Sequence, residues 1–74
     1  MFNKMDLNCL AYANGFTMWH YTTSDKLYEV LNDPYYWDQA HQECDVSDGD
    51  FVFINAGDGN TSGYLVFDGH WRIE

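Results

Sequence analysis

Two stretches of the chain have the side-chain pattern of a β-strand, in which successive residues point to opposite faces. Residues 16–22 and 51–55 are rich in aromatic and β-branched side chains, which fit the pleated surface of a sheet. In residues 16–22 large apolar groups point to both sides, which predicts a strand covered on both faces. Residues 64–67 and 70–73 have the same character. The chain is therefore expected to end in a three-stranded antiparallel meander.

Turn residues separate these strands. Asn14-Gly15 is a strong turn signal and closes an N-terminal arm, residues 1–15, in which a short strand is expected. The glycine-rich stretch 56–63 is interpreted as a hairpin loop. Asp68-Gly69 is the kind of two-residue link that favours a type I′ turn.

One short helix is predicted between the strands, from about Ser24 to Leu31. Residues 23–25 offer an N-cap and an acidic first turn. Apolar side chains at 27, 30 and 31 share one helical face. Pro34 ends the helix, because the residue before a proline is driven out of the α region.

These elements predict an α+β fold: a small antiparallel β-sheet or partly closed β-barrel with one short helix. The chain reads as one domain, residues 1–74, made of the arm 1–15 and a β-rich body, 16–74. Five residues are predicted to form the core: Trp19, Val30, Leu31, Phe53 and Ile54.

Composition and charge narrow the possible functions. Of 74 residues, 46% are hydrophobic and 19% aromatic, and the formal net charge is -9. Such an acidic chain does not bind nucleic acid by neutralising phosphates and is repelled by anionic membranes. No stretch approaches the roughly 20 apolar residues of a membrane span, and residues 1–6 lack the apolar run of a secretory signal. Neither a nucleic acid nor a membrane is expected as a partner.

Cysteine and histidine give little support for a metal site or a disulfide scaffold. Cys9 and Cys44 are interpreted as reduced thiols of a protein made in a cytoplasm, with one bridge between them left open. His41 and Cys44 have the spacing of zinc ligands, but no second pair accompanies them. Surface histidines and a small buried thiol are the favoured interpretation, so no metal is expected.

The acidic and glycine-rich segments do not match known calcium-binding or phosphate-binding loops. Residues 45–50 do not match a calcium loop, which needs acids at alternate positions and a distant Glu. Residues 57–63 lack the lysine and the following helix of a phosphate-binding loop. No Ser, Cys or Thr has a local base partner, so the prediction is a non-enzymatic protein without a cofactor.

The surplus of aromatic residues is the remaining feature. A ring-rich core explains part of it, but the domain is too small to hide every ring. Tyr35, Tyr36 and Trp37 are therefore predicted to form a patch that contacts a partner, because Tyr and Trp are favoured anchors at interfaces.

Several short segments follow one another in a distinctive order: Trp19-His20-Tyr21, Thr23, Asp25, Tyr36-Trp37, Gly49-Asp50 and the apolar strand 51–56. Together they resemble the pattern of a family of small phage and prophage proteins. The likeness covers roughly residues 8 to 59, and the Trp-His-Tyr stretch is its most distinctive part. The acidic stretch from Asp33 to Asp50 and the short C-terminus depart from the family pattern.

The resemblance implies a virion protein, made in the host cytoplasm, that is a capsid decoration or cement component or the base of a head fibre. Its expected partner is the major capsid protein or another virion protein, with self-association in a symmetric assembly. A second hypothesis is an acidic inhibitor of a host defence or transcription protein that mimics DNA, acting through Asp33, Asp38, Asp45 and Asp48. An enzyme or metal protein is the third.

Overall fold

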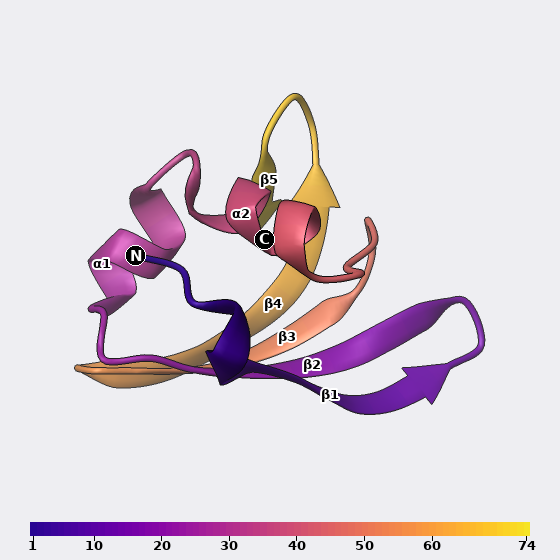
Figure 1. Cartoon of the computed structure of the whole chain (residues 1–74), viewed down its shortest axis with the longest axis horizontal. Helices are drawn as coiled ribbons and strands as arrows, with labels where there is room; N and C mark the ends of the chain where they lie inside the picture. Colours follow the sequence, from indigo (N-terminus) through magenta and orange to yellow (C-terminus); the bar gives the residue numbers. More distant parts are fainter.

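Five strands form one open, mixed sheet in the computed structural model, which describes residues 1–74 (Figure 1). The strands follow the order of the sequence: β1 Leu7–Ala13, β2 Phe16–Thr22, β3 Phe51–Ala56, β4 Gly59–Phe67 and β5 Trp71–Ile73. A 3-10 turn, η1 (Lys4–Asp6), precedes them, and two helices, α1 (Leu27–Asn32) and α2 (Tyr36–Glu43), lie between β2 and β3. The α+β class is confirmed, with two helices instead of one.

Strand pairing is antiparallel throughout except between β2 and β3, which run parallel. A parallel pair needs a long crossover, and residues 23–50 supply it with both helices. The crossover lies on one side of the sheet (Figure 1). The predicted meander of the last three strands, β3 to β5, is confirmed.

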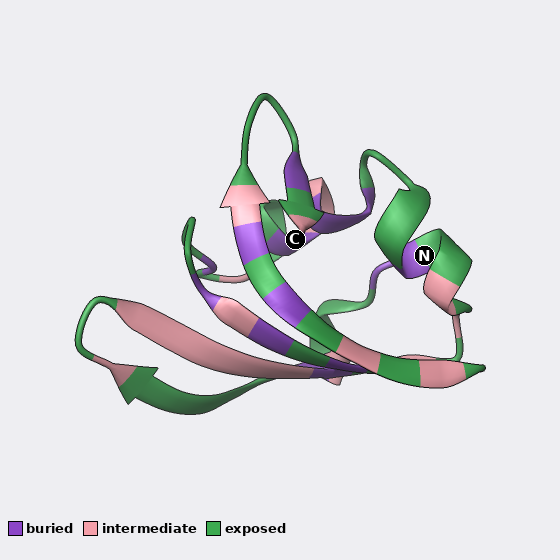
Figure 2. Ribbon diagram, turned by 180° about the vertical axis from the view of Figure 1, so that it is seen from behind, coloured by how far each residue is buried: buried purple, intermediate pink, exposed green.

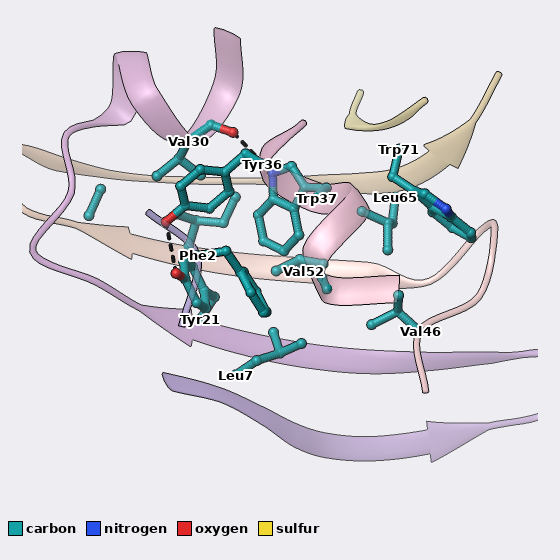
Figure 3. Close-up of a cluster of buried hydrophobic side chains, with 13 residues drawn as sticks. Phe2, Leu7, Tyr21, Val30, Tyr36, Trp37, Val46, Val52, Leu65 and Trp71 are labelled. Atoms are coloured by element: carbon teal, nitrogen blue, oxygen red, sulfur yellow. Dashed lines mark hydrogen bonds between the residues drawn. The ribbon is translucent and has the colours of Figure 1, made fainter. Parts of the chain in front are cut away.

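The core lies between the helices and the covered face of the sheet (Figures 2 and 3). Alternate residues of β3 and β4 are buried, which follows from the two-residue period of a strand. The buried apolar side chains are Phe2, Leu7, Tyr21, Val30, Tyr36, Trp37, Ala40, Val46, Val52, Ile54, Ala56, Leu65 and Trp71.

Two of the five predicted core residues are wrong. Val30 and Ile54 are buried, and Trp19 is half-buried against the core. Leu31 and Phe53 remain 39% and 38% exposed. Phe53 is exposed because the helices cover only one face of the sheet. Since β2 belongs to the same sheet, the prediction that β2 is covered on both faces is also wrong.

A carboxylate from another part of the chain caps the N-terminus of α1. Thr23 was expected within the N-cap, but its Oγ1 accepts from the Asp25 N–H at 3.0 Å, forming a turn that delays the helix. The helix begins at Leu27, whose N–H donates to Asp58 Oδ1 at 2.8 Å. The β3–β4 turn therefore caps α1 across 31 residues of sequence.

Two of the connecting loops differ from the prediction. Gly57 and Asp58 alone connect β3 to β4, so the expected glycine-rich loop is mostly strand. A Cβ on Gly63 would lie 2.7 Å from the Glu74 carbonyl oxygen, which explains why glycine fits inside that strand. Three residues, 68–70, connect β4 to β5. Only Gly69 among them has a positive φ, so the predicted type I′ turn is absent.

Asp50 is the one buried acidic side chain and fastens three segments together. Its carboxylate accepts from the backbone N–H groups of Thr17 and Ser47, each at 2.9 Å. It also accepts from the indole Nε1–H of Trp19 at 3.0 Å. These bonds join the start of β3 to β2, its parallel neighbour.

Candidate binding surface

The second face of the sheet is not covered by any helix (Figures 1 and 2). Strand register places Met18, Phe51 and Tyr64 in one row across β2, β3 and β4. His20 and Phe53 occupy the neighbouring row, beside Ser62. We call these six residues, Met18, His20, Phe51, Phe53, Ser62 and Tyr64, the open face.

The rings of the open face hold one another in place. Phe51 packs edge-on against both Phe53 and Tyr64, with ring centroids 5.0 Å apart in each pair. Edge-to-face pairs are favoured by the charge distribution of aromatic rings. Phe53 and Tyr64 are still 38% and 54% exposed. The sheet therefore presents an ordered apolar surface to solvent.

A shallow depression of about 310 Å³ adjoins these rings. Its walls are His20, Phe53 and uncharged polar or apolar neighbours on β3 and β4: Ile54, Asn55, Asn60 and Thr61. The depression thus combines a ring face with amide and hydroxyl groups, and no carboxylate or ammonium lines it.

Charge is absent from the four longer strands. No Asp, Glu, Lys or Arg occurs in β1, β2, β3 or β4, although the chain has fifteen such residues. All twelve acids lie in helices, loops and chain ends. The open face is therefore free of fixed charge, and a partner can cover it without desolvating an ion.

Most aspartates are engaged in fold-stabilising hydrogen bonds. Asp33 Oδ1 accepts from the Tyr35 N–H at 2.9 Å, and Asp48 Oδ1 from the Phe67 N–H at 3.0 Å. Asp38 accepts from the Trp71 N–H at 2.9 Å. Of the four aspartates predicted to mimic DNA, only Asp45 has no such bond, so the set does not form a free row of carboxylates.

The predicted contact patch at Tyr35, Tyr36 and Trp37 does not exist as a surface. Tyr36 and Trp37 begin α2 and are each only 1% exposed (Figure 3). The Trp37 Nε1–H donates to the Val30 carbonyl oxygen at 3.0 Å, which holds the indole under α1. Only Tyr35 remains exposed, and its ring meets His70 edge-on. The helical backbone turned two of the three rings inward.

Tyr36 belongs to a buried chain of hydroxyl groups. Its OH donates to Asp25 Oδ2 at 2.8 Å and lies 2.8 Å from the OH of Tyr21 (Figure 3). Burial and these bonds raise the pKa of Tyr36 well above its usual range. The carboxyl of Asp25 also receives the N-terminal ammonium group, the largest cause of its lowered pKa. These hydrogen-bonded groups link the N-terminus to β2 and α2.

The histidine, cysteine and acidic side chains that could bind a metal ion do not cluster. No cluster of three His, Cys, Asp or Glu side chains could hold a metal ion. The ring of His41 stacks on that of Trp71, with centroids 4.6 Å apart. Both cysteines are free: Cys9 is exposed and Cys44 is half-buried, and burial raises the pKa of the Cys44 thiol. No helix is long and apolar enough to cross a membrane.

Sequence reasoning missed the open face. The alternation of residues 16–22 and 51–55 did reveal two faces, but it placed both in the interior. Of the rings on this face, Phe53 was predicted as core and Tyr64 was left unassigned.

No protein-family model matches the chain, and comparison with curated proteins and with solved structures found no significant match.

Proposed function

We propose that this chain is a non-enzymatic structural protein of a phage virion, attached to the major capsid protein or another virion protein through the open face. One observation carries the proposal: an ordered aromatic cluster lies uncovered on a sheet face without charge. Exposed apolar surfaces of this kind mark sites of protein association. Aromatic rings and the absence of charge are typical of the centre of an interface.

The sequence resemblance supplies the virion context. Trp19 and Tyr21 of the Trp-His-Tyr stretch lie on β2, and Asp50 of the Gly-Asp turn accepts from Trp19 at 3.0 Å. The Trp-His-Tyr stretch and the Gly-Asp turn therefore contact each other in space. His20, between the two rings, points to the open face. The resemblance thus includes a residue of the proposed contact surface.

Attachment to a particle also suits a small, weak interface. A capsid repeats its subunits many times, so a linked or symmetric component holds by several contacts at once. The negative charge of the helices and loops keeps an abundant protein soluble before assembly. DNA mimicry remains the alternative, but it receives less support because Asp33, Asp38 and Asp48 each accept a backbone hydrogen bond.

The test is recovery of the chain in purified, salt-washed particles of the phage that encodes it. We expect a constant copy number per particle and loss of at least about ten-fold for Phe53→Ser, since a truncated interface anchor typically costs more than 1.4 kcal/mol. Tyr28→Ser is the matched control, because Tyr28 is a 76% exposed ring on α1, away from the open face.

Two results would overturn the proposal. One is absence of the unmodified chain from washed particles. The other is equal recovery of the Phe53→Ser and Tyr28→Ser variants, which would show that the open face does not carry the attachment. A tight complex with a basic host protein that is lost on neutralising Asp45 and Asp48 would favour the DNA-mimic alternative.

A further inference from the structure

Strand β1 forms an unguarded edge of the sheet. It pairs only with β2, so the backbone N–H and C=O groups on its other side have no strand partner. Its residues 8–12 are exposed without exception. Such an edge is a template for another strand unless charge, proline or a covering element blocks it.

The usual protections are largely missing from β1. The whole hairpin, residues 7–22, contains no charged residue and no proline, in a chain of which 20% is charged. One irregularity in the pairing, between Cys9 and Ala11, is the only interruption of the edge. The opposite edge differs, since β5 is three residues long and carries Arg72, which pairs with Asp68 and Glu74.

The β1–β2 hairpin also projects beyond the helices at one end of the sheet (Figure 1). Leu10 and Tyr12 are 56% and 82% exposed, and nearly the whole of β1 is exposed in Figure 2. Beyond Met18, where β2 no longer pairs with β3, the end of the hairpin is a two-stranded ribbon, and such a ribbon is by itself only marginally stable in water. Covering this ribbon would therefore stabilise it.

We propose that the occupant of this edge is β1 of a second copy, paired antiparallel about a two-fold axis perpendicular to the sheet. The distribution of charge argues for it. An uncharged edge offers no electrostatic recognition to a charged strand, whereas another β1 is uncharged and equally apolar. In antiparallel pairing, Asp6 of each copy lies toward the uncharged Asn14-Gly15 end of the other, so like charges do not oppose each other.

The two-fold pairing also keeps the acidic groups apart. The twelve acids of each copy lie outside β1 to β4, so none of them lies on the paired strands themselves. A seam of seven residues a side falls in the class of small interfaces, under about 1,200 Å² in total. The dimer is therefore weak and forms at tens of micromolar and above, or at the high local concentration of an assembly.

Pairing of this kind would produce one continuous ten-stranded sheet. An axis perpendicular to the sheet leaves the two open faces on the same side. The dimer thus offers two copies of the aromatic surface to one partner. The inference about self-pairing goes beyond the proposed function and stands without it, since it concerns the isolated protein.

The experiment measures the mass of the purified full chain by sedimentation velocity from about 1 µM to about 500 µM. We expect a monomer–dimer equilibrium for the unmodified chain and for Tyr28→Lys, and a monomer throughout for Leu10→Lys. Both substitutions replace an exposed apolar residue by lysine and change the net charge equally, but only Leu10 lies on the edge. Circular dichroism checks that both variants fold.

Hydrogen exchange locates the contact. Amides of β1 should be protected more strongly at high than at low concentration, while those of β4 should not change. A chain that is monomeric at all concentrations, a Leu10→Lys variant that still dimerises, or a mass that grows beyond the dimer would each overturn the two-fold pairing. Because no particles are involved, failure here is distinct from failure of the virion assignment.

Discussion

Removal of the buried Asp50 carboxylate is the sharpest test of how the fold is fixed. Its two oxygens accept three N–H groups, from Thr17, Trp19 and Ser47, at 2.9 to 3.0 Å. Asp50→Ala would leave all three donors without this acceptor. Leaving a buried donor unsatisfied costs about 1–3 kcal/mol. Since the three bonds are only partly buried, we expect the low end for each, or about 3 kcal/mol in total.

That loss is large for a domain of this size. Stabilities of about 0.05–0.15 kcal/mol per residue give about 4–11 kcal/mol for 74 residues. Asp50→Asn keeps the shape of the side chain but turns an NH₂ group toward an N–H donor. It should therefore recover only part of the loss.

Urea denaturation followed by tryptophan fluorescence measures the effect. With a slope of about 1 kcal/mol per molar urea, the midpoint should fall by about 3 M for Asp50→Ala. Asp45→Ala is the matched control, because Asp45 is exposed, accepts no hydrogen bond and carries the same charge. An Asp50→Ala midpoint close to that of Asp45→Ala would refute the structural role assigned to the carboxylate.

Three further predictions follow from single sites. A Cβ on Gly57 would lie 2.4 Å from a backbone oxygen of the β2–α1 segment. Gly57→Ala should therefore lower the free energy of unfolding, measured by urea denaturation, by about 3 kcal/mol. Ser62→Ala, at an exposed position, should leave that free energy unchanged. The backbone N–H of Trp71, and then His70, lower the pKa of Asp38. The Asp38 carboxylate therefore stabilises the fold above pH about 4, and this stabilisation is lost as the pH falls through the lowered pKa of the folded state. Asp38→Asn should flatten the curve of stability against pH in that acid range, and parallel curves for the two proteins would contradict this. Iodoacetamide should modify Cys9 before Cys44 in the native chain, because Cys9 is exposed and burial raises the pKa of the Cys44 thiol; equal rates would be inconsistent with the structure.

Local patterns located two of the five strands closely, whereas the first five residues of β4 were predicted as a loop. The two-residue period located β2 and β3 to within a residue, because side chains alternate wherever the backbone is extended. The parallel pairing of β2 with β3 was missed, although a helix between two strands favours it. The aromatic start of α2 concealed that helix, since Tyr36 and Trp37 are weak helix formers and follow Pro34.

The candidate binding surface could be predicted only in part. Alternation shows that Val52 and Phe53 point to opposite faces, but it does not show which face the helices cover. That choice depends on packing between the helices and the sheet, such as the hydrogen bond between the hydroxyls of Tyr36 on α2 and Tyr21 on β2. The same packing explains the error at Tyr36 and Trp37. The three rings were predicted to form an exposed contact patch, whereas α2 places two of them in the core.

The division between charged loops and uncharged strands has a physical basis in this chain. With three lysines and arginines against twelve acids, ion pairs cannot satisfy the carboxylates. Backbone N–H groups do so instead at five aspartates: Asp33, Asp38, Asp48, Asp50 and Asp58. These donors lie at helix starts, in loops and near the ends of strands, because most N–H groups inside a sheet already bond to neighbouring strands. Acids stabilise the fold where turns occur and would only add repulsion on the strands. The sheet is thus left uncharged on its open face and along β1, and these are the surfaces through which an acidic protein can associate at the least electrostatic cost.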